Sequence, residues 1–395
     1  MISIYILWLF IFLLVAILLK LLDIKKNYIM CFFITIFIII FVINLKSSID
    51  AAINGSKLVV LAILPTIFPF SVICNLLICY DGITLYSKIL GPLLCKPLGL
   101  SKSSSFPIAA SFICGYPLGA KYSSDIYNLG YIHKDEYERL LNIASNAGPI
   151  FILGSVSVAM LNNIKYGYIL LIANYLSSLL IGFITKKPYT NYKIQANKSL
   201  KFQESNFGTN LKNSIEGAIN TTLNVSAFVI IFSVIISIIK SNTFIRAAFN
   251  FLENLINLPA VIIYNLMLGS IEFTNGAKLI SEINLSISLK LSIISFILCF
   301  SSLSVIAQVT SIVGKDNPNL KKYIRLKFLQ GIIGFIITFI ASNIILKAVP
   351  TFNTSPNYSY YSVINRIFIP IIFLLCISLF ISIVYKCLKE KLHSS

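Results

Sequence analysis

The sequence predicts an all-α polytopic membrane protein with about nine transmembrane helices and two re-entrant helical hairpins in an inverted repeat. The first observation is composition: 57% of the 395 residues are hydrophobic, 12% are charged, and the mean hydropathy is +0.87. A soluble domain carries about a quarter charged residues. The second is a series of apolar runs of membrane-spanning length, and the third is a pair of apolar arms only half that long.

Apolar runs of spanning length occur along the whole chain. A crossing helix needs about 20 predominantly apolar residues. The runs that approach or exceed this length are 2–19, 28–45, 58–80, 143–161, 166–184, 217–239, 287–313, 328–346 and 363–385. Lys20, Lys25 and Lys26 follow the first run rather than precede it. We therefore expect an uncleaved first span with its N-terminus outside.

The lysines and arginines between the runs predict the topology. The formal net charge of +18 comes from basic loops, which bacterial membranes retain on the cytosolic side. Segments 186–212 and 315–327 and the C-terminal tail are basic and are expected inside, whereas 347–361 holds a single lysine and is expected outside. These assignments agree only if segment 81–142 begins and ends inside and segment 240–286 begins and ends outside.

Each of those last two segments contains an apolar arm too short to cross, which predicts a re-entrant hairpin. The arms are residues 104–114 and 258–269, and Gly119-Ala120-Lys121 after the first recurs as Gly276-Ala277-Lys278 after the second. Each hairpin precedes a span with a polar interruption, Ser145-Asn146-Ala147-Gly148-Pro149 in the first half and Ser301-Ser302-Leu303-Ser304 in the second. Hairpins that enter from opposite sides predict the inverted repeat of secondary transporters, whose substrate lies where the broken helices meet.

Lys121 and Lys278 are the leading substrate-binding candidates. Each is expected near the N-terminus of a return helix, next to Gly119 or Gly276, where backbone N–H groups favour anions. Two such lysines facing each other suit two carboxylates. The alternative is that each lysine reaches an interface or pairs with a local acid four residues on, which is Asp125 or Glu282.

Glu272 is the candidate for binding a coupling cation or proton, because it is an acid in an apolar setting two residues before the second tip. Its alternative role is to pair with Lys278. Neutral hydrogen-bonding groups add further candidates for substrate contact, or alternatively for interhelical hydrogen bonds. These groups are Ser145, Asn146, Asn275 and Ser302, with Ser301 and Ser304 beside the last.

Several function classes find no support in the sequence. The eight cysteines form no Cys-x-x-Cys pair and the two histidines lack metal-ligand spacing, so we expect no metal and no cofactor. The segment from Gly115 to Tyr122 approaches a phosphate-binding loop but lacks its second glycine and its Ser/Thr. There is no nucleophile elbow or His-Glu-x-x-His motif. We therefore expect neither an enzyme nor a nucleic-acid-binding protein.

The chain resembles the YlbJ-type (SpoVV) sporulation integral membrane proteins. The resemblance covers most of the chain and is dense over residues 64–154, whereas the second half departs more freely. The residues that carry it are Leu64-Pro65-Thr66-Ile67-Phe68-Pro69-Phe70, Gly91-Pro92-Leu93-Leu94, Ser105-Phe106-Pro107, Gly115-Tyr116-Pro117-Leu118-Gly119-Ala120-Lys121, Glu138-Arg139-Leu140-Leu141 and Ser145-Asn146-Ala147-Gly148-Pro149.

That resemblance implies a nucleoside-recognition Gate domain, which the family shares with concentrative nucleoside transporters and with the ferrous-iron transport protein FeoB. It also implies a spore-forming bacterium, a place in the outer membrane around the forespore, and movement of dipicolinic acid out of the mother-cell cytosol toward the spore cortex. Dipicolinate is a small planar dianion, which fits the two lysines. The resemblance implies no individual site residues.

The expected organisation follows from these segments. We expect an N-terminal pair of spans (1–50), a first repeat (51–190) with its hairpin at 104–130, a basic cytosolic linker (191–212), a second repeat (213–347) with its hairpin at 258–285, and a C-terminal helix with a basic cytosolic tail (348–395). The expected partners are a small anionic substrate and the lipid bilayer, with a second copy of the chain or another sporulation membrane protein left open. Two alternatives to dipicolinate transport remain: transport of a nucleoside or cell-wall precursor, and a non-transporting scaffold for the spore envelope.

Overall fold

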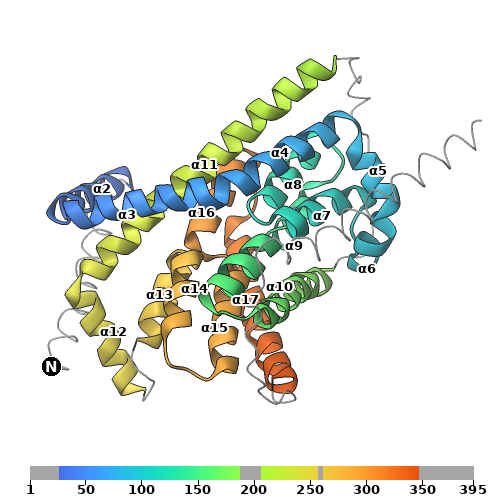
Figure 1. Cartoon of the computed structure of the whole chain (residues 1–395). Coiled ribbons are helices and arrows are strands. Elements are labelled where there is room, and N and C mark those ends of the chain that lie inside the picture. Colours follow the sequence, from blue (N-terminus) through green and yellow to red (C-terminus); the bar gives the residue numbers. More distant parts are fainter. Residues whose placement is uncertain (1–25, 187–205, 257–260, 347–395) are drawn as a thin grey trace, which may run out of the picture.

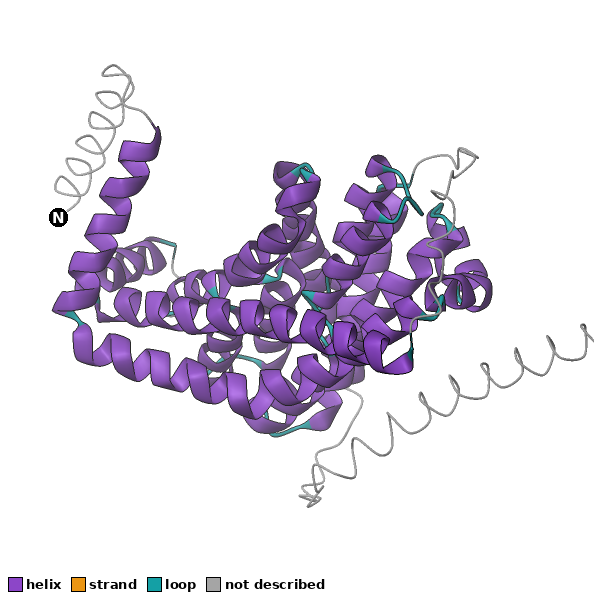
Figure 2. Ribbon diagram, turned by 90° about the horizontal axis from the view of Figure 1, so that it is seen from above, coloured by secondary structure: helices purple, strands orange, loops and turns teal. Residues whose placement is uncertain are grey.

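The computed structural model describes residues 26–186, 206–256 and 261–346, and the following refers to these residues alone. They form helices joined by short loops, and they contain no strand (Figure 2). The predicted all-α fold class is thereby confirmed at this level. The predicted spans 2–19 and 363–385 and most of the linker 191–212 lie outside the described residues.

The helices follow one another in two series. The first series is α2 (Lys26–Ile43), α3 (Leu45–Leu58), η1 (Val59–Ile63), α4 (Leu64–Cys79), α5 (Gly82–Ile89), η2 (Gly91–Cys95), α6 (Lys96–Leu98), η3 (Lys102–Ser104), α7 (Ser105–Cys114), α8 (Leu118–Asn128), α9 (Lys134–Ile143), η4 (Ile150–Met160) and α10 (Ile164–Ile184). The second series is α11 (Phe207–Ser241), α12 (Thr243–Leu255), α13 (Ile262–Ile271), α14 (Phe273–Glu282), α15 (Ile287–Phe300), α16 (Ser302–Val313), η5 (Gly314–Asp316) and α17 (Leu320–Ile345).

The number of spans differs from the prediction. Within the described ranges, 4 helical stretches are long and apolar enough to cross a membrane, or 6 if each of two bent pairs is one span. The count of about nine is therefore not confirmed. In the first bent pair Asn27–Ile43 meets Leu45–Leu61 at 97°, and in the second Ile67–Cys79 meets Gly82–Ile89 at 92°. Hydropathy measures the length of an apolar segment, and it carries no signal for a bend between two consecutive helices.

A long scaffold lies across one face of the molecule. Helix α11 packs along both α3 and α4, as Figure 1 shows. Its buried positions include the small residues Ser214, Ala218 and Ser226, which let the backbones approach closely. Gly55 of α3 contributes to this approach, because a Cβ there would lie 3.2 Å from the Cα of Ile230. The scaffold thus holds α4 beside the first hairpin.

A helix pair lies in each segment predicted to form a re-entrant hairpin, and re-entry into the membrane stays a prediction. In the first, α7 and α8 pack against each other and turn at Gly115, whose φ of +84° lies in a region that side chains rarely adopt. In the second, α13 and α14 pack together and turn at Glu272. Each arm has 10 or 11 residues, about half a membrane crossing. Their relation as an inverted repeat stays a prediction.

Both predicted interruptions are also present. The first lies between the end of α9 at Ile143 and the start of η4 at Ile150. The second lies between α15, which ends at Phe300, and α16, which begins at Ser302. Helix α17 packs against α15 and α10, and it also contacts α9. The two breaks, the two hairpins and α17 therefore surround one interior region.

Candidate functional site

The tips of the two hairpins meet at the first break. The backbone N–H of Tyr116 donates a hydrogen bond to the Asn146 carbonyl oxygen (2.6 Å). The Tyr116 ring lies edge-on to Phe273 at the start of α14, with ring centroids 5.3 Å apart. Phe273 also contacts Phe151 of η4 at 4.8 Å between centroids. Both hairpins and the first broken span thus meet here, although they lie far apart in the sequence.

The second break carries backbone strain. Ser301 and Ser302 have φ of 74° and 54°, in the left-handed region that non-glycine residues seldom occupy. Such residues persist only where their surroundings hold them there, and they cluster at functional sites. The Ser302 hydroxyl lies 2.9 Å from that of Ser304, whereas the Ser301 hydroxyl is buried and has no hydrogen-bond partner among the described residues. The break therefore presents an unsatisfied polar atom to the interior.

Buried polar side chains fill the region between the breaks, and we call them the central polar cluster. Its members come from α7, the first break, α10, α15 and α17, and each has an exposed fraction below 3%. They are Ser111, Ser145, Asn146, Asn174, Ser177, Cys299, Tyr323, Lys327 and Gln330.

Asn146 connects three parts of this cluster. Its amide nitrogen donates to the Ser111 hydroxyl (3.2 Å) and to the Ile143 carbonyl oxygen (2.7 Å). Its amide oxygen accepts from the Gln330 amide (3.1 Å). Next to it, the Ser145 hydroxyl lies 3.0 Å from that of Tyr323. The first break is thereby hydrogen-bonded to the first hairpin on one side and to α17 on the other.

Lys327 is the charged member of the cluster. Its side chain is fully buried, and its ammonium donates to the Ser145 carbonyl oxygen (2.6 Å) and to Gln330 Oε1 (2.7 Å). Both acceptors are neutral. The ion pairs formed by described residues do not include Lys327. A buried charge without a counterion is costly, and inside a membrane protein such a residue marks a functional site by default.

Of the residues predicted from the sequence, Ser145 and Asn146 belong to the central polar cluster and Ser302 lies at the second break. The two lysines lie elsewhere. Lys121 is half-buried on α8 and donates to Asn75 Oδ1 of α4 (2.9 Å). Lys278 is exposed on α14. Their binding of substrate stays a prediction.

The two predicted glycines are packing residues. A Cβ at Gly119 would lie 2.0 Å from the Ala144 carbonyl oxygen, at the start of the first break. A Cβ at Gly276 would lie 2.1 Å from the Cα of Gly269 on the facing arm. Real Cβ atoms do not approach so closely, so the absence of a side chain sets both helix positions. The repeated Gly-Ala-Lys tripeptide therefore marks close helix packing at both hairpins.

Glu272 has a structural task in the second hairpin. Its carboxylate caps α14, accepting from the backbone N–H groups of Thr274 (2.9 Å) and Asn275 (2.8 Å) and from the Asn275 amide (2.9 Å). It contacts no ammonium among the ion pairs of the described residues, including Lys278. Its role in ion coupling stays a prediction. Asn275 uses its side chain in this cap, next to the tip.

Sequence reasoning missed Lys327, Gln330 and Tyr323. Lys327 follows four other basic residues, so the positive-inside rule assigned it to a cytosolic loop. The signal that could have found it is a polar and small stripe at helical spacing on α17. The buried residues of this stripe are Tyr323, Lys327, Gln330, Gly331, Gly334, Thr338 and Ser342.

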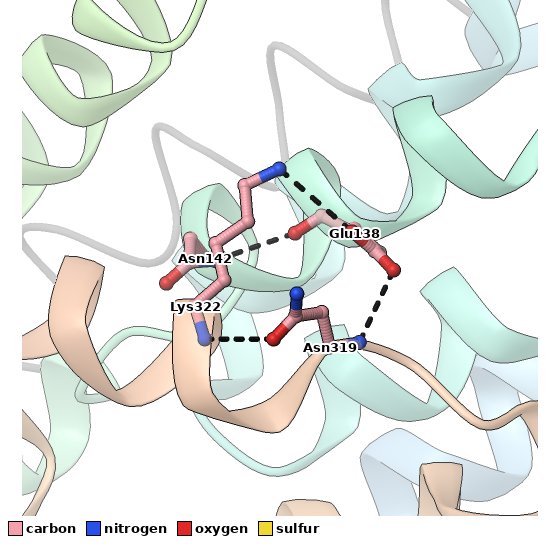
Figure 3. Close-up of polar contacts among 4 residues, drawn as sticks. All are labelled: Glu138, Asn142, Asn319 and Lys322. Atoms are coloured by element: carbon pink, nitrogen blue, oxygen red, sulfur yellow. Dashed lines mark hydrogen bonds and ion pairs between the residues drawn. The ribbon is translucent and has the colours of Figure 1, made fainter.

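A set of polar contacts joins the two halves in segments that the loop charges predict to be cytosolic. The Asp316 carboxylate accepts hydrogen bonds from Ser124 (2.5 Å), Asn128 (3.1 Å) and Tyr137 (2.7 Å) of the first half. Nearby, Glu138 accepts from the backbone N–H of Asn319 (3.1 Å) and pairs with Lys322 (3.7 Å), as Figure 3 shows. We call Asp316 and Glu138, with these partners, the inner contacts. They join α8 and α9 to the loop before α17.

The chain is similar in sequence to known proteins. Residues 60–140 match the Gate family, described as nucleoside recognition. The sporulation integral membrane protein YlbJ of Bacillus subtilis (strain 168) is 26% identical over 309 residues, which are 73% of this chain and 76% of that protein. The chain is therefore similar to YlbJ over most of its length. The predicted resemblance is thereby confirmed, and the protein is a multi-pass membrane protein.

Solved structures of CNTnw are also similar to the chain. The inward-facing, substrate-bound state has a TM-score of 0.45 with 19% identity and covers 70% of this chain and 74% of that one. A CNTnw variant in an intermediate state has a TM-score of 0.45 with 17% identity, over 73% and 76% of the two chains.

Proposed function

We propose that this protein is a secondary transporter or facilitator that moves dipicolinic acid, a small aromatic dicarboxylate, out of the mother-cell cytosol across the outer forespore membrane. Two findings support the biological setting: its similarity to a sporulation integral membrane protein and its match to the Gate family. The protein acts as a carrier, and it needs no resident cofactor to do so.

One observation carries the proposal: both hairpin tips and the first break contact each other through Tyr116, Asn146 and Phe273. Irregular backbone at membrane depth is tolerated only where protein buries it or where it lines a cavity. Transporters with inverted repeats use such broken helices to form the substrate site, and they alternate access by moving one repeat against the other. In this proposal the two hairpins enter from opposite sides, and the inner contacts close the cytosolic path.

The surroundings of the contact suit a flat ring. The Tyr116 and Phe151 rings both lie edge-on to Phe273 and are held within 5.3 Å and 4.8 Å of it, centroid to centroid. Aromatic faces of this kind bind planar ligands through stacked or edge-to-face contacts. The Tyr116 hydroxyl is buried and has no hydrogen-bond partner among the described residues. A pyridine ring with polar substituents would satisfy both features.

The experiment is a flux measurement on the purified full chain in liposomes. Labelled dipicolinate should enter vesicles saturably, and protein-free vesicles should take up none. Gly115→Val should abolish this flux, because a Cβ there would lie 2.5 Å from the Gly148 nitrogen and would separate the tip from the break. Gly314→Ala is the control, since nothing lies within 4 Å of its added methyl group. Wild-type vesicles that take up no dipicolinate would exclude this substrate.

A nucleoside or cell-wall precursor is the second candidate, because the Gate family is described as nucleoside recognition. The neutral amides of Asn146, Asn174 and Gln330 could bind such a solute. Uridine added in excess to the same vesicles distinguishes the two candidates. Dipicolinate transport predicts no competition by uridine, whereas nucleoside transport predicts uptake of uridine itself.

A further inference from the structure

We propose that the central polar cluster is a carboxylate-binding site in which the Lys327 ammonium neutralises one carboxylate of the transported solute. This inference rests on the proposed function and deepens it: the substrate class is a small organic acid, and the residue that selects for its charge lies on α17 rather than on either hairpin.

The first argument is the unbalanced charge. Lys327 is fully buried, yet its two hydrogen-bond partners are a backbone carbonyl oxygen and a neutral amide. An ammonium group has three donors, so one remains beyond these two bonds. Burial of a charge is sustained when an opposite charge completes the pair. An anionic solute that enters this region supplies that opposite charge.

The second argument is the set of polar groups around the same region. The Tyr116 and Ser301 hydroxyls are buried and lack partners among the described residues. The backbone N–H of Tyr116 bonds the carbonyl oxygen of Asn146, and the Asn146 side chain bonds Gln330 in the cluster. Ser301 follows Cys299 by two residues. These hydroxyls and the ammonium therefore present three unused donors from three elements, a pattern that fits carboxylate oxygens.

The third argument is the direction of the half-helices. The element η4 begins at Ile150, after the first break, and α16 begins at Ser302, after the second. Both N-terminal ends thus lie beside the cluster, where their free backbone N–H groups and helix dipoles favour negative charge. Together with the buried ammonium, they give the region a positive potential without any countering acid inside the cluster.

Glu272 is the acid at the tip of the second hairpin, one residue before Phe273, whose ring contacts Tyr116. Both of its carboxylate oxygens already accept hydrogen bonds from the start of α14. The N-terminal end of α14 stabilises the negative charge of Glu272, so Glu272 is not the counterion of Lys327. The net charge that remains in this region is positive, and a bound organic anion neutralises it.

The test compares two ligands of the same shape and different charge. Dipicolinate and its neutral diamide, pyridine-2,6-dicarboxamide, are titrated onto the full chain in detergent by calorimetry. Wild type should bind dipicolinate at least tenfold more tightly than the diamide. Lys327→Met should weaken dipicolinate binding roughly 100-fold, as loss of a buried charge partner does, and should change diamide binding less than about threefold.

Two further variants separate charge from structure. Lys321→Met removes an exposed lysine from the same helix and should leave both affinities unchanged. Lys327→Gln keeps a donor toward the Ser145 carbonyl oxygen while it removes the charge, so it should reproduce the ligand selectivity of Lys327→Met. Equal weakening of both ligands would assign Lys327 a structural role and overturn the proposal. If neither variant folds, the wild-type ratio decides, and equal binding of acid and diamide overturns it.

A panel of picolinate, isophthalate and succinate distinguishes this inference from the proposed function. Lys327-dependent binding of another carboxylate without dipicolinate binding would refute the assigned substrate and support the anion site. Dipicolinate flux that is unchanged in Lys327→Met would support the assigned substrate and overturn the anion site. Failure of every carboxylate to bind wild type overturns both.

Discussion

Two glycines hold the hairpins in register, and replacing them tests the packing directly. The perturbations are Gly119→Ala and Gly276→Ala. The added methyl carbon would lie 2.0 Å from the Ala144 carbonyl oxygen in the first and 2.1 Å from the Gly269 Cα in the second. Ordinary van der Waals contacts begin near 3.4 Å, so each backbone must move by more than 1 Å. Neither neighbour is a side chain that could rotate away.

The cost of this overlap follows from overpacking in a close-packed interior. Inserting a methyl group into such a site destabilises by about 1–3 kcal/mol, and a backbone obstacle places both variants at the upper end. A loss of about 3 kcal/mol lowers Tm by about 6 °C or more in a large domain. Gly208→Ala is the matched control, because it lies in a helix with nothing within 4 Å of its Cβ. It should be neutral or stabilise by about 0.5–1 kcal/mol.

Thermal unfolding of purified protein in detergent, followed by loss of monodisperse protein, measures these differences. Dipicolinate flux in liposomes should fall with Gly119→Ala and Gly276→Ala, because displaced arms cannot bring the tips together. A Tm for either variant equal to that of Gly208→Ala would refute the close packing and, with it, the placement of that hairpin.

Three other perturbations test the neighbouring contacts. Asp316→Ala removes a carboxylate that accepts three hydrogen bonds. It should destabilise the fold by about 1.5–3 kcal/mol and make the cytosolic side more reactive to a cysteine reagent. Unchanged labelling would argue against closure by the inner contacts. Glu272→Ala should lose the α14 cap at a cost of about 1 kcal/mol. Glu272→Gln should keep most of the cap through its one amide oxygen. Equal melting temperatures of the two variants would contradict the capping role. Lys121→Met should lower the maximal flux but not the affinity for dipicolinate, because the Lys121 ammonium bonds Asn75 of α4. A tenfold loss of affinity would show that Lys121 contacts the substrate.

The hairpins and the two breaks were predictable because local chemistry determines them. Half-length apolar arms cannot cross a membrane, and Gly115 at the turn supplies a conformation that other residues avoid. The five-residue stretch from Ser145 to Pro149 has no apolar periodicity, and it lies between α9 and η4 as expected. Elements with such local signals need no knowledge of the rest of the fold.

The direction in which a side chain points was not predictable, because tertiary packing sets the rotation of each helix. Lys121 lies on the face of α8 that contacts α4, and Lys278 lies on an exposed face of α14. Lys327 was assigned to a loop because a run of basic residues precedes it, whereas α17 already begins at Leu320. Its burial depends on contacts with Ser145, 182 residues earlier in the chain. The polar and small stripe on α17 indicates which face is buried, but no local pattern identifies Ser145 as the partner.

The span count was limited for a similar reason. Hydropathy identifies apolar length but not bends, so the 97° turn between α2 and α3 left no trace in the prediction. The polar helix α3 was not predicted as helix either. Many of its polar residues, such as Lys46 and Asp50, are exposed, and packing against α11 stabilises it.

The most direct test of the central claim is the distance between the Lys327 ammonium and bound dipicolinate. Solid-state NMR dephasing between ¹⁵Nζ-labelled lysine and ¹³C-carboxylate dipicolinate measures it in the full chain in lipid. We predict an ammonium nitrogen within about 4 Å of the carboxylate carbon, as in a charge-assisted hydrogen bond, lost in Lys327→Met and retained in Lys321→Met. Bound dipicolinate without dephasing, or dephasing that persists in Lys327→Met, would contradict the account.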